Sequence, residues 1–347
     1  MSKENKIKIG ISIGDINGIG IEVILKTFTD KRMLDFCIPV IFGSTKVVSY
    51  YNKILKSEMQ FHGISDVNKI AEGKINVINL WNEDIEITPG KSTEVGGKYA
   101  YVSLKESVKS LNSGAIDVLV TAPINKENIQ SEEFKFAGHT EFLEHEIEGK
   151  SLMILMTDGL RVGLITGHIP ISEVSSSITP ELIKGKVAIL YETLQKDFGI
   201  SKPKIALLGL NPHSGDNGLI GKEDEEIIRP TVKELFNEKK LVYGPYAADG
   251  FFGSNVYKQF DGVLAMYHDQ GLAPFKALSF GKGVNFTAGL KLIRTSPDHG
   301  TAYEIAGKGV ADESSFKEAL FKSIELFKKR SEYLELNQNK LKATKRL

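Results

Sequence analysis

Residues 7–28 read IKIGISIGDINGIGIEVILKTF, a short β-branched run followed by a glycine-rich turn and an apolar segment with helical spacing. This order of strand, turn and helix is typical of a βα unit. Further apolar runs follow at residues 38–44, 75–80, 116–123, 204–210 and 262–269. Because these runs are continuously apolar, each predicts a strand that helices cover on both faces. The sequence therefore predicts an α/β protein.

Segments with helical spacing lie between the predicted strands. Along residues 181–198, apolar side chains recur at steps of three to five on one stripe, at Leu182, Val187, Leu190, Leu194 and Phe198. A last helix is predicted over residues 314–330. Helices that alternate with parallel strands favour a three-layer αβα arrangement.

One segment departs from this alternation. Residues 151–166, SLMILMTDGLRVGLIT, contain two apolar runs on either side of Asp158-Gly159. An Asp-Gly pair between apolar runs is a strong hairpin signal. We therefore expect an antiparallel insertion at this point.

The chain length predicts more than one domain. A chain of 347 residues exceeds what one hydrophobic core usually supports, so two domains around a central cleft are expected. No repeat or low-complexity linker separates them, which suggests that the chain passes between the domains more than once. We place residues 1–125 with 286–347 in the first α/β domain and residues 126–285 in the second, with approximate boundaries.

Composition limits the partners and the compartment. Apolar residues make up 41% and charged residues 25%, and 44 basic residues balance 44 acidic ones. A balanced charge argues against binding to nucleic acid or to an anionic membrane. The single cysteine, Cys37, excludes an intrachain disulfide, and no run is long and apolar enough to span a membrane. The expected location is the cytoplasm.

Three histidines share one setting in this predicted fold. His168 follows the run that ends at Ile165, His213 follows residues 204–210, and His268 lies at the end of the last run. In an open α/β sheet the carboxyl ends of the strands line the ligand crevice, so the three rings are candidates to converge. Three imidazoles with open positions are typical of a catalytic metal site. A packing or loop role is the alternative for each histidine alone.

Two aspartates lie close to these histidines in the sequence. Asp269 directly follows His268, and Asp249 lies in a loop after another apolar run. Either carboxylate is a candidate to orient a ligand histidine or to move a proton. The alternative is that both are turn or helix-capping residues.

A second set of residues suggests an anion site. His139 and Thr140 stand at the start of a predicted helix, with Thr140 as its expected N-cap. Farther on, Lys276, Asn285 and Arg294 supply two cations and an amide, and Arg294 lies in an apolar stretch. A cation in apolar surroundings needs a partner, which a phosphate or carboxylate of a small substrate would supply. An internal salt bridge is the alternative.

Two glycine-rich segments complete the candidates. Gly14, Gly18 and Gly20 match neither the usual dinucleotide-binding spacing nor a P-loop, which leaves a tight turn or a loop that faces the active cleft. In residues 296–309, SPDHGTAYEIAGKG, the glycines frame a short helix that is expected to start at Thr301. Its N–H groups and His299 would then face a ligand.

Six ordered motifs carry a resemblance to a known family. TAPINKENI, FAGHTEFL, GLITGHIP, NPHSGDNG, YHDQGLAPFK and RTSPDHGTAYEIAGKG together resemble the 4-hydroxythreonine-4-phosphate dehydrogenase family of pyridoxal phosphate biosynthesis. The resemblance extends from Ile7 to about Leu326. DHGTAYEIAGKG is also similar to the cofactor loop of the isocitrate and isopropylmalate dehydrogenase-like group, which implies that fold rather than a standard Rossmann fold.

The resemblance implies an activity. It is the NAD- or NADP-dependent oxidation of the secondary alcohol of 4-phosphooxy-L-threonine to a β-keto acid, which loses CO2 to leave 3-amino-2-oxopropyl phosphate. A metal on the hydroxyl would promote loss of its proton and stabilise the enolate. It also implies a homodimer with its active site at the subunit boundary and one divalent metal ion (zinc, magnesium or cobalt) held by His168, His213 and His268.

The resemblance also assigns the family's other functional positions to individual residues of this sequence. The cofactor loop then belongs to the first domain, whereas the metal ligands, the hairpin and the dimer interface belong to the second. Asp249, Asp269 and Lys276 are the candidate catalytic residues. The substrate-contacting positions correspond to His139, Thr140, Lys276, Asn285 and Arg294, and we assign cofactor binding to His299, Gly300, Thr301 and Ala302.

The sequence differs from the family at one loop, and it allows three alternative functions. Ile16 and Ile21 stand where the family's first glycine loop usually has prolines, so this loop is expected to be more mobile. A 4-phospho-D-threonate or D-erythronate dehydrogenase of the same family is the nearest alternative function. A phosphate acyltransferase and a catalytically inactive phosphate-binding regulator are more distant ones.

Overall fold

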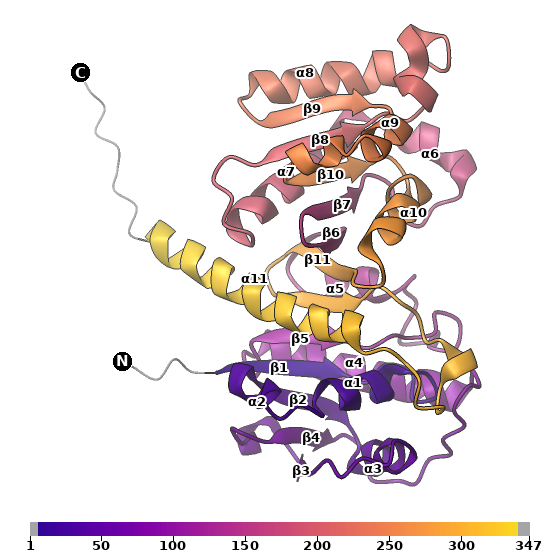
Figure 1. The fold of residues 1–347 in the computed structure, drawn as a ribbon, viewed down its shortest axis with the longest axis vertical. Helices are drawn as coiled ribbons and strands as arrows, with labels where there is room; N and C mark the ends of the chain where they lie inside the picture. Colours follow the sequence, from indigo (N-terminus) through magenta and orange to yellow (C-terminus); the bar gives the residue numbers. More distant parts are fainter. Residues whose placement is uncertain (1–5, 339–347) are drawn as a thin grey trace. The chain divides into compact units, whose positions relative to one another are not determined.

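The structure is a computed structural model that describes residues 6–338 (Figure 1). The chain divides into two compact units. Of the described residues, unit 1 holds 6–157 together with 276–324, and unit 2 holds 158–275 together with 325–338. Each unit is an α/β structure, as the sequence predicts.

Unit 1 is built on a mostly parallel sheet with strand order β3-β4-β2-β1-β5-β12-β11-β6. Only β11 runs antiparallel to its neighbours β12 and β6. The strands are β1 (Ile7–Ser12), β2 (Cys37–Gly43), β3 (Phe61–Ile64), β4 (Ile75–Asn79), β5 (Val118–Thr121), β6 (Gly149–Thr157), β11 (Val284–Leu290) and β12 (Arg294–Pro297). Its helices are α1 (Gly20–Thr27), α2 (Met33–Phe36), α3 (Thr45–Ile54), α4 (Glu94–Asn112) and α5 (His139–Glu146).

The core of unit 1 lies on both faces of this sheet. Val40 and Phe42 of β2 pack in one cluster with Leu104 and Val108 of α4. Ile41, whose side chain points to the opposite face of the strand, is also buried. Two covered faces make the predicted three-layer arrangement and explain why the strand sequences are continuously apolar.

The four strands of unit 2 run parallel to one another in the order β7-β10-β8-β9. Its strands are β7 (Leu160–Leu164), β8 (Lys204–Leu208), β9 (Leu241–Tyr246) and β10 (Gly262–Ala265). Its helices are α6 (Ile171–Ser177), α7 (Pro180–Lys196), α8 (Arg229–Asn237) and α9 (Ala248–Gly253). Of the stripe predicted for residues 181–198, Val187, Leu190 and Leu194 are fully buried on α7. Leu182 and Phe198 are only half-buried, and Ile183 is buried instead of Leu182.

The chain passes between the units at three points, as the missing linker suggested. These are the turn after Thr157 and the interiors of two helices, α10 (His268–Ser279) and α11 (Ser314–Gln338), drawn in orange and yellow in Figure 1. Residues 126–157 and 276–285, which the sequence placed in the second domain, group with unit 1, and residues 325–338, which it placed in the first, group with unit 2. Part of the cause is that β11 pairs with β12 and β6 pairs with β11, which joins both strands to the other strands of unit 1.

The hairpin signal marks a real turn. Asp158-Gly159 connects β6 to β7, and Gly159 has the positive φ of 82° that such a turn requires. β6 also pairs in antiparallel register with β11, which the sequence did not predict. Within residues 6–338, no helix is both long and apolar enough to cross a bilayer.

The first glycine loop is a tight, buried βα turn. Gly14 has φ +65°, and a Cβ atom placed on it would lie 2.2 Å from the carbonyl oxygen of Pro123. Ile16 and Ile21 are 0% and 1% exposed, and the Ile16 carbonyl accepts a hydrogen bond from the Tyr51 hydroxyl at 2.6 Å. The loop is packed along its length, which argues against the mobility expected from the missing prolines.

We predict that Gly14→Ala lowers the free energy of unfolding of unit 1 by about 2 kcal/mol or more, because alanine meets both positive φ and the Pro123 carbonyl. The matched control is Gly185→Ala in α7, where a Cβ meets no atom within 4 Å. That change should stabilise by about 0.5–1 kcal/mol. Urea denaturation of both variants checks this, and equal stability of Gly14→Ala and wild type would contradict it.

Candidate active site

The three candidate metal histidines follow neighbouring strands of unit 2. His168 comes after β7, His268 after β10 and His213 after β8, and these strands are adjacent and parallel in the order β7-β10-β8. Parallel neighbours end at the same edge of a sheet, which is where ligands bind in open α/β folds. We call this edge, with its three histidine loops, the histidine edge.

Two of the three rings lie side by side. The ring centres of His168 and His268 are 5.4 Å apart, with an interplanar angle of 44°. Two imidazoles that share one tetrahedral zinc ion, with Zn–N bonds of about 2.0–2.1 Å, have ring centres roughly 5 Å apart. His268 Nδ1 also lies 2.7 Å from the Asp269 carboxylate, which fixes the ring and leaves Nε2 available. The separation of the two ring centres is compatible with one shared divalent ion.

Convergence of all three histidines within one chain is not found. Across residues 6–338, no group of three or more His, Cys, Asp or Glu side chains is arranged to hold a metal ion. His213 instead lies in a left-handed turn within Pro212–Gly218, where its φ is 53°. Each non-glycine residue in that conformation costs roughly 1–2 kcal/mol, so the surrounding structure must hold it.

A buried carboxylate supports the root of the His213 loop. Asp224 is 0% exposed and accepts hydrogen bonds from the backbone N–H groups of Leu210 and Asn211 at 2.9 and 3.0 Å. The Asn211 side-chain amide donates to the same carboxylate at 3.0 Å. Three donors on one buried carboxylate fix the chain immediately before the left-handed turn.

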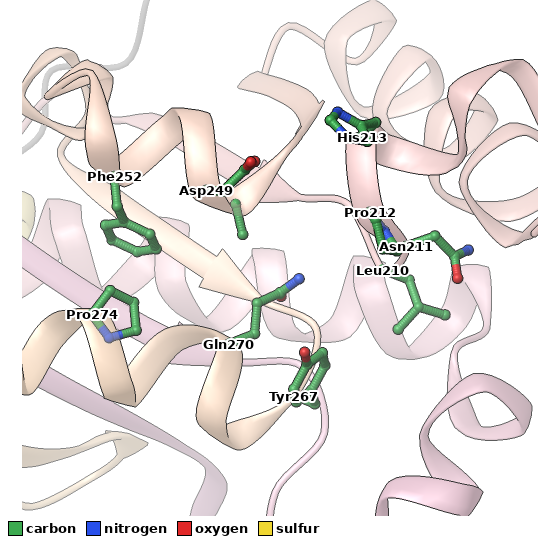
Figure 2. Close-up of a pocket in the computed structure, with 10 residues that line it drawn as sticks. Leu210, Asn211, Pro212, His213, Asp249, Phe252, Tyr267, Gln270 and Pro274 are labelled. Carbon is green, nitrogen blue, oxygen red and sulfur yellow. The ribbon is translucent and has the colours of Figure 1, made fainter. Parts of the chain in front are cut away.

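A pocket of about 470 Å³ opens at the histidine edge (Figure 2). His213 and Asp249 both line it, Asp249 from the first turn of α9. Its wall is otherwise apolar or uncharged and consists of Leu210, Asn211, Pro212, Ala248, Phe252, Tyr267, Gln270 and Pro274. Asp249 is therefore placed for contact with a ligand, whereas Asp269 is engaged with His268.

Arg294 is the centre of the second candidate group, in unit 1. It is 2% exposed, and its guanidinium donates to the hydroxyl groups of Thr121 and Thr287 at 3.0 Å each. Burial lowers the pKa of Arg294 to about 9, opposed by the charge of Glu141. A guanidinium held on hydroxyl groups in the core keeps its position for an anion. Thr121 and Thr287 were not predicted from the sequence, although both are polar residues inside apolar runs.

His139 is the first residue of α5 and belongs to the same group. Burial, and then the charges of Arg294 and Lys126, hold its pKa well below 6.5. Its Nε2 atom is buried and has no hydrogen-bond partner within residues 6–338, and the same is true of Asn285 Oδ1. Buried polar atoms without partners are typical of a site that a ligand completes.

Thr140 and Lys126 differ from what the sequence predicts for this group. Thr140 is not an N-cap, because α5 begins one residue earlier and its N-cap is Gly138, without a side-chain cap. Lys276 is exposed, and its ammonium lies 3.4 Å from the carbonyl oxygen of Asp298. Lys126 was not singled out from the sequence, and its charge acts on His139.

The predicted cofactor loop has no helix at Thr301. A single 3-10 turn begins at Tyr303 instead, because Ala302 adopts a left-handed conformation with φ 44°. The expected helix N-terminus is therefore absent. His299 Nδ1 lies 3.0 Å from the carbonyl oxygen of Gly300, and its buried Nε2 has no hydrogen-bond partner within the described chain.

This loop is fastened to the first glycine turn. The Ile19 N–H donates to the carbonyl oxygen of Thr301 at 3.0 Å, and the Tyr303 hydroxyl donates to the Asp15 carboxylate at 2.8 Å. Gly18 leaves room for the contact, since a Cβ atom there would lie 3.0 Å from the Thr301 oxygen. The first glycine turn thus supports the loop and is covered by it.

Comparison with known proteins agrees with this architecture. The family described as "Pyridoxal phosphate biosynthetic protein PdxA" matches residues 35–322. A 4-hydroxythreonine-4-phosphate dehydrogenase from Bacteroides thetaiotaomicron is 52% identical, covering 94% of this chain and 91% of its own. A D-threonate 4-phosphate dehydrogenase from Cupriavidus necator is 38% identical, covering 93% and 98%. The crystal structure of 4-hydroxythreonine-4-phosphate dehydrogenase from Klebsiella pneumoniae, 31% identical, has a TM-score of 0.80 and covers 94% and 100%.

The fold and these matches define a dehydrogenase, an oxidoreductase that acts on a CH–OH group. The chain belongs to the family of the pyridoxal phosphate biosynthetic protein PdxA. Membership implies a nicotinamide cofactor and a small phosphorylated substrate. The relatives at 52% and 38% identity are both named dehydrogenases, which favours a dehydrogenase over the phosphate acyltransferase weighed from the sequence.

The lowered pKa of His139 predicts a dependence of stability on pH. As the pH falls below about 6.5, the unfolded chain takes up a proton that the folded chain does not. This group then lowers the free energy of unfolding by up to about 1.4 kcal/mol per pH unit. His139→Gln should therefore lose less stability than wild type between neutral and acidic pH. Urea denaturation at several pH values measures both slopes, and identical slopes would contradict the assignment.

Proposed function

We propose that this chain oxidises the secondary alcohol of 4-phosphooxy-L-threonine to a β-keto acid, which loses CO2 to leave 3-amino-2-oxopropyl phosphate in pyridoxal phosphate biosynthesis. The observation that carries this proposal is the 52% identity, across nearly the whole chain, with a relative of that name. The buried arginine group and the histidine edge supply the two kinds of binding that such a substrate needs.

The residues around Arg294 are proposed to bind the substrate. Arg294 offers a preorganised cation, and the free Nε2 of His139 and Oδ1 of Asn285 offer hydrogen-bonding positions. Thr140 and Lys276 complete the proposed set, which follows the family's substrate positions. Because His139 is neutral at pH 7, it accepts or donates one hydrogen bond rather than adding a charge.

The histidine edge is proposed to hold one divalent metal ion. His168 and His268 are adjacent in one chain, and we propose that His213 completes the ligand set at a boundary between two copies. Imidazole ligands favour zinc or cobalt over magnesium, which prefers oxygen. When bound, the ion supplies positive charge that lowers the pKa of the substrate hydroxyl and balances negative charge as CO2 leaves.

The proton and the cofactor complete the proposal. Asp249 is our candidate for the group that takes up the hydroxyl proton, because it lines the same pocket as His213 (Figure 2). Asp269 orients His268, and Lys276 is the second candidate for proton transfer. NAD or NADP is proposed to contact His299, Gly300, Thr301 and Ala302, where the free His299 Nε2 is a polar contact point. When bound, the nicotinamide cofactor would supply the hydride acceptor.

A homodimer follows from the same proposal. Large apolar side chains are exposed beside the histidine loops: Ile171 is 71% and Leu219 81% exposed, and Ile169 and Ile220 are 36% and 38% exposed. Apolar residues gathered around loops with ligand histidines suit a surface that a second copy covers. The proposed compartment remains the cytoplasm.

The second candidate function is the oxidation of 4-phospho-D-threonate or D-erythronate. It is favoured by the 38% identity with the relative of that kind from Cupriavidus necator. The two substrates differ in whether an amine or a hydroxyl lies beside the carboxylate, and both would use the same phosphate and metal groups.

We predict that the purified protein, given NAD or NADP with zinc or cobalt, reduces the cofactor with 4-phosphooxy-L-threonine at least 10-fold faster, in kcat/KM, than with 4-phospho-D-threonate. A tenfold preference corresponds to about 1.4 kcal/mol of differential binding in the transition state. Absorbance of the reduced nicotinamide measures both rates. Reduction with only the sugar acid would replace the proposed function by the second candidate.

Metal dependence is a separate prediction. Excess chelator should abolish activity, and His268→Ala and His213→Ala should each lose bound metal, measured by atomic emission on the purified protein. His145→Ala, an exposed histidine of α5, is the matched control and should retain it. Full activity in chelator, or unchanged metal content in His268→Ala, would contradict the metal site.

A further inference from the structure

The roots of the three histidine loops are linked by one chain of hydrogen bonds in unit 2. Its centre is Met266, the residue after β10 and two residues before His268. The Met266 carbonyl accepts from both the N–H and the hydroxyl of Thr166, at 3.2 and 2.7 Å. Thr166 lies two residues before His168 and is 4% exposed. The loops of His168 and His268 are thus joined directly.

A side-chain amide extends the link to the third loop. Gln270, in the first turn of α10, accepts from the Met266 N–H at 2.7 Å through Oε1. Its Nε2 donates to the carbonyl oxygen of Gly209 at 2.6 Å. Gly209 follows β8 and lies four residues before His213, and its own N–H donates to the Tyr246 carbonyl at 2.8 Å. Gln270 therefore spans the loops of His268 and His213.

The position requires an amide. The pairing of β8 with β10 ends at Leu207 and Leu264, so the backbone groups beyond them separate. The Met266 N–H and the Gly209 carbonyl are one donor and one acceptor that would otherwise lack partners at a largely buried edge. A side-chain amide offers an acceptor and a donor on one rigid group, whereas a carboxylate offers only acceptors.

We propose that Gln270 is a positioning residue of the metal site: its amide fixes the loop of His268 and the loop of His213 in the same chain, which would serve the two metal sites of a dimer, and thereby sets the affinity for the metal ion. Gln270 does not contact the ion and acts through the two histidine loops. The inference rests on the proposed function, because it assumes that these histidines bind metal. Residues that orient ligand groups typically change metal affinity about 10- to 100-fold when they are replaced.

The test is a titration of the metal-free, full-length protein with Co²⁺. Calorimetry measures the dissociation constant, and visible absorption reports the coordination of the bound ion. Gln270→Met keeps the size of the side chain and removes both hydrogen bonds. Gln270→Glu keeps the acceptor for Met266 and removes the donor to Gly209, and it serves if the methionine variant does not fold. Both should raise the dissociation constant for Co²⁺ about 10-fold or more and alter the absorption bands.

The matched control is Gln195→Met, also in unit 2. Gln195 lies in α7 and donates one hydrogen bond to the carbonyl oxygen of Ser201 at 3.0 Å, before β8 begins. Its replacement removes a similar hydrogen bond at the opposite end of the strand. The Co²⁺ affinity of this variant should equal that of wild type, whatever happens to its thermal stability.

Two results would overturn the role of Gln270. One is an unchanged Co²⁺ dissociation constant in a folded Gln270 variant, and the other is an equal loss of affinity in Gln195→Met, which would indicate general loosening of unit 2. If the proposed metal site itself is wrong, the result is different. Wild-type protein would then bind no Co²⁺, or the His268→Ala variant would bind Co²⁺ as well as wild type does.

Discussion

The candidate active site depends on one constraint, that neighbouring parallel strands end at the same edge and leave backbone groups there without strand partners. In unit 2 this edge is closed by side chains rather than by further sheet. Thr166 and Gln270 satisfy the backbone of Met266, and Asp224 satisfies the chain before His213. The side chains that form hydrogen bonds with the backbone at this edge also hold the histidine loops in place. The same hydrogen bonds therefore stabilise unit 2 and position the candidate metal ligands.

In unit 1 the main constraint is a different one, the burial of the positively charged guanidinium of Arg294. Arg294 begins β12 and carries its charge into the core, where burial lowers its pKa and Thr121 and Thr287 receive its hydrogen bonds. The same charge helps to keep His139 neutral. A strained electrostatic arrangement of this kind is costly for folding and is the usual mark of a binding site.

The sequence predicted the six apolar strands and α7, because periodicity and burial report directly on packing. It missed β3, in which only Ile64 is buried, and β11. It also missed β12, whose Arg294 and Pro297 do not resemble a strand although the strand is fully buried. The identities of the candidate residues came from motifs. Their geometry did not: the left-handed turn at His213 and the displacement of the expected helix from Thr301 depend on tertiary contacts that no local pattern encodes.

The central claim is that the histidine edge of unit 2 binds one divalent metal ion. Anomalous diffraction at the cobalt edge, from crystals of the wild-type protein grown with Co²⁺, tests it most directly. The account predicts one strong peak per chain at bonding distance, about 2.0–2.2 Å, from ring nitrogens of both His168 and His268. A peak elsewhere, with these two rings free of metal, would contradict it.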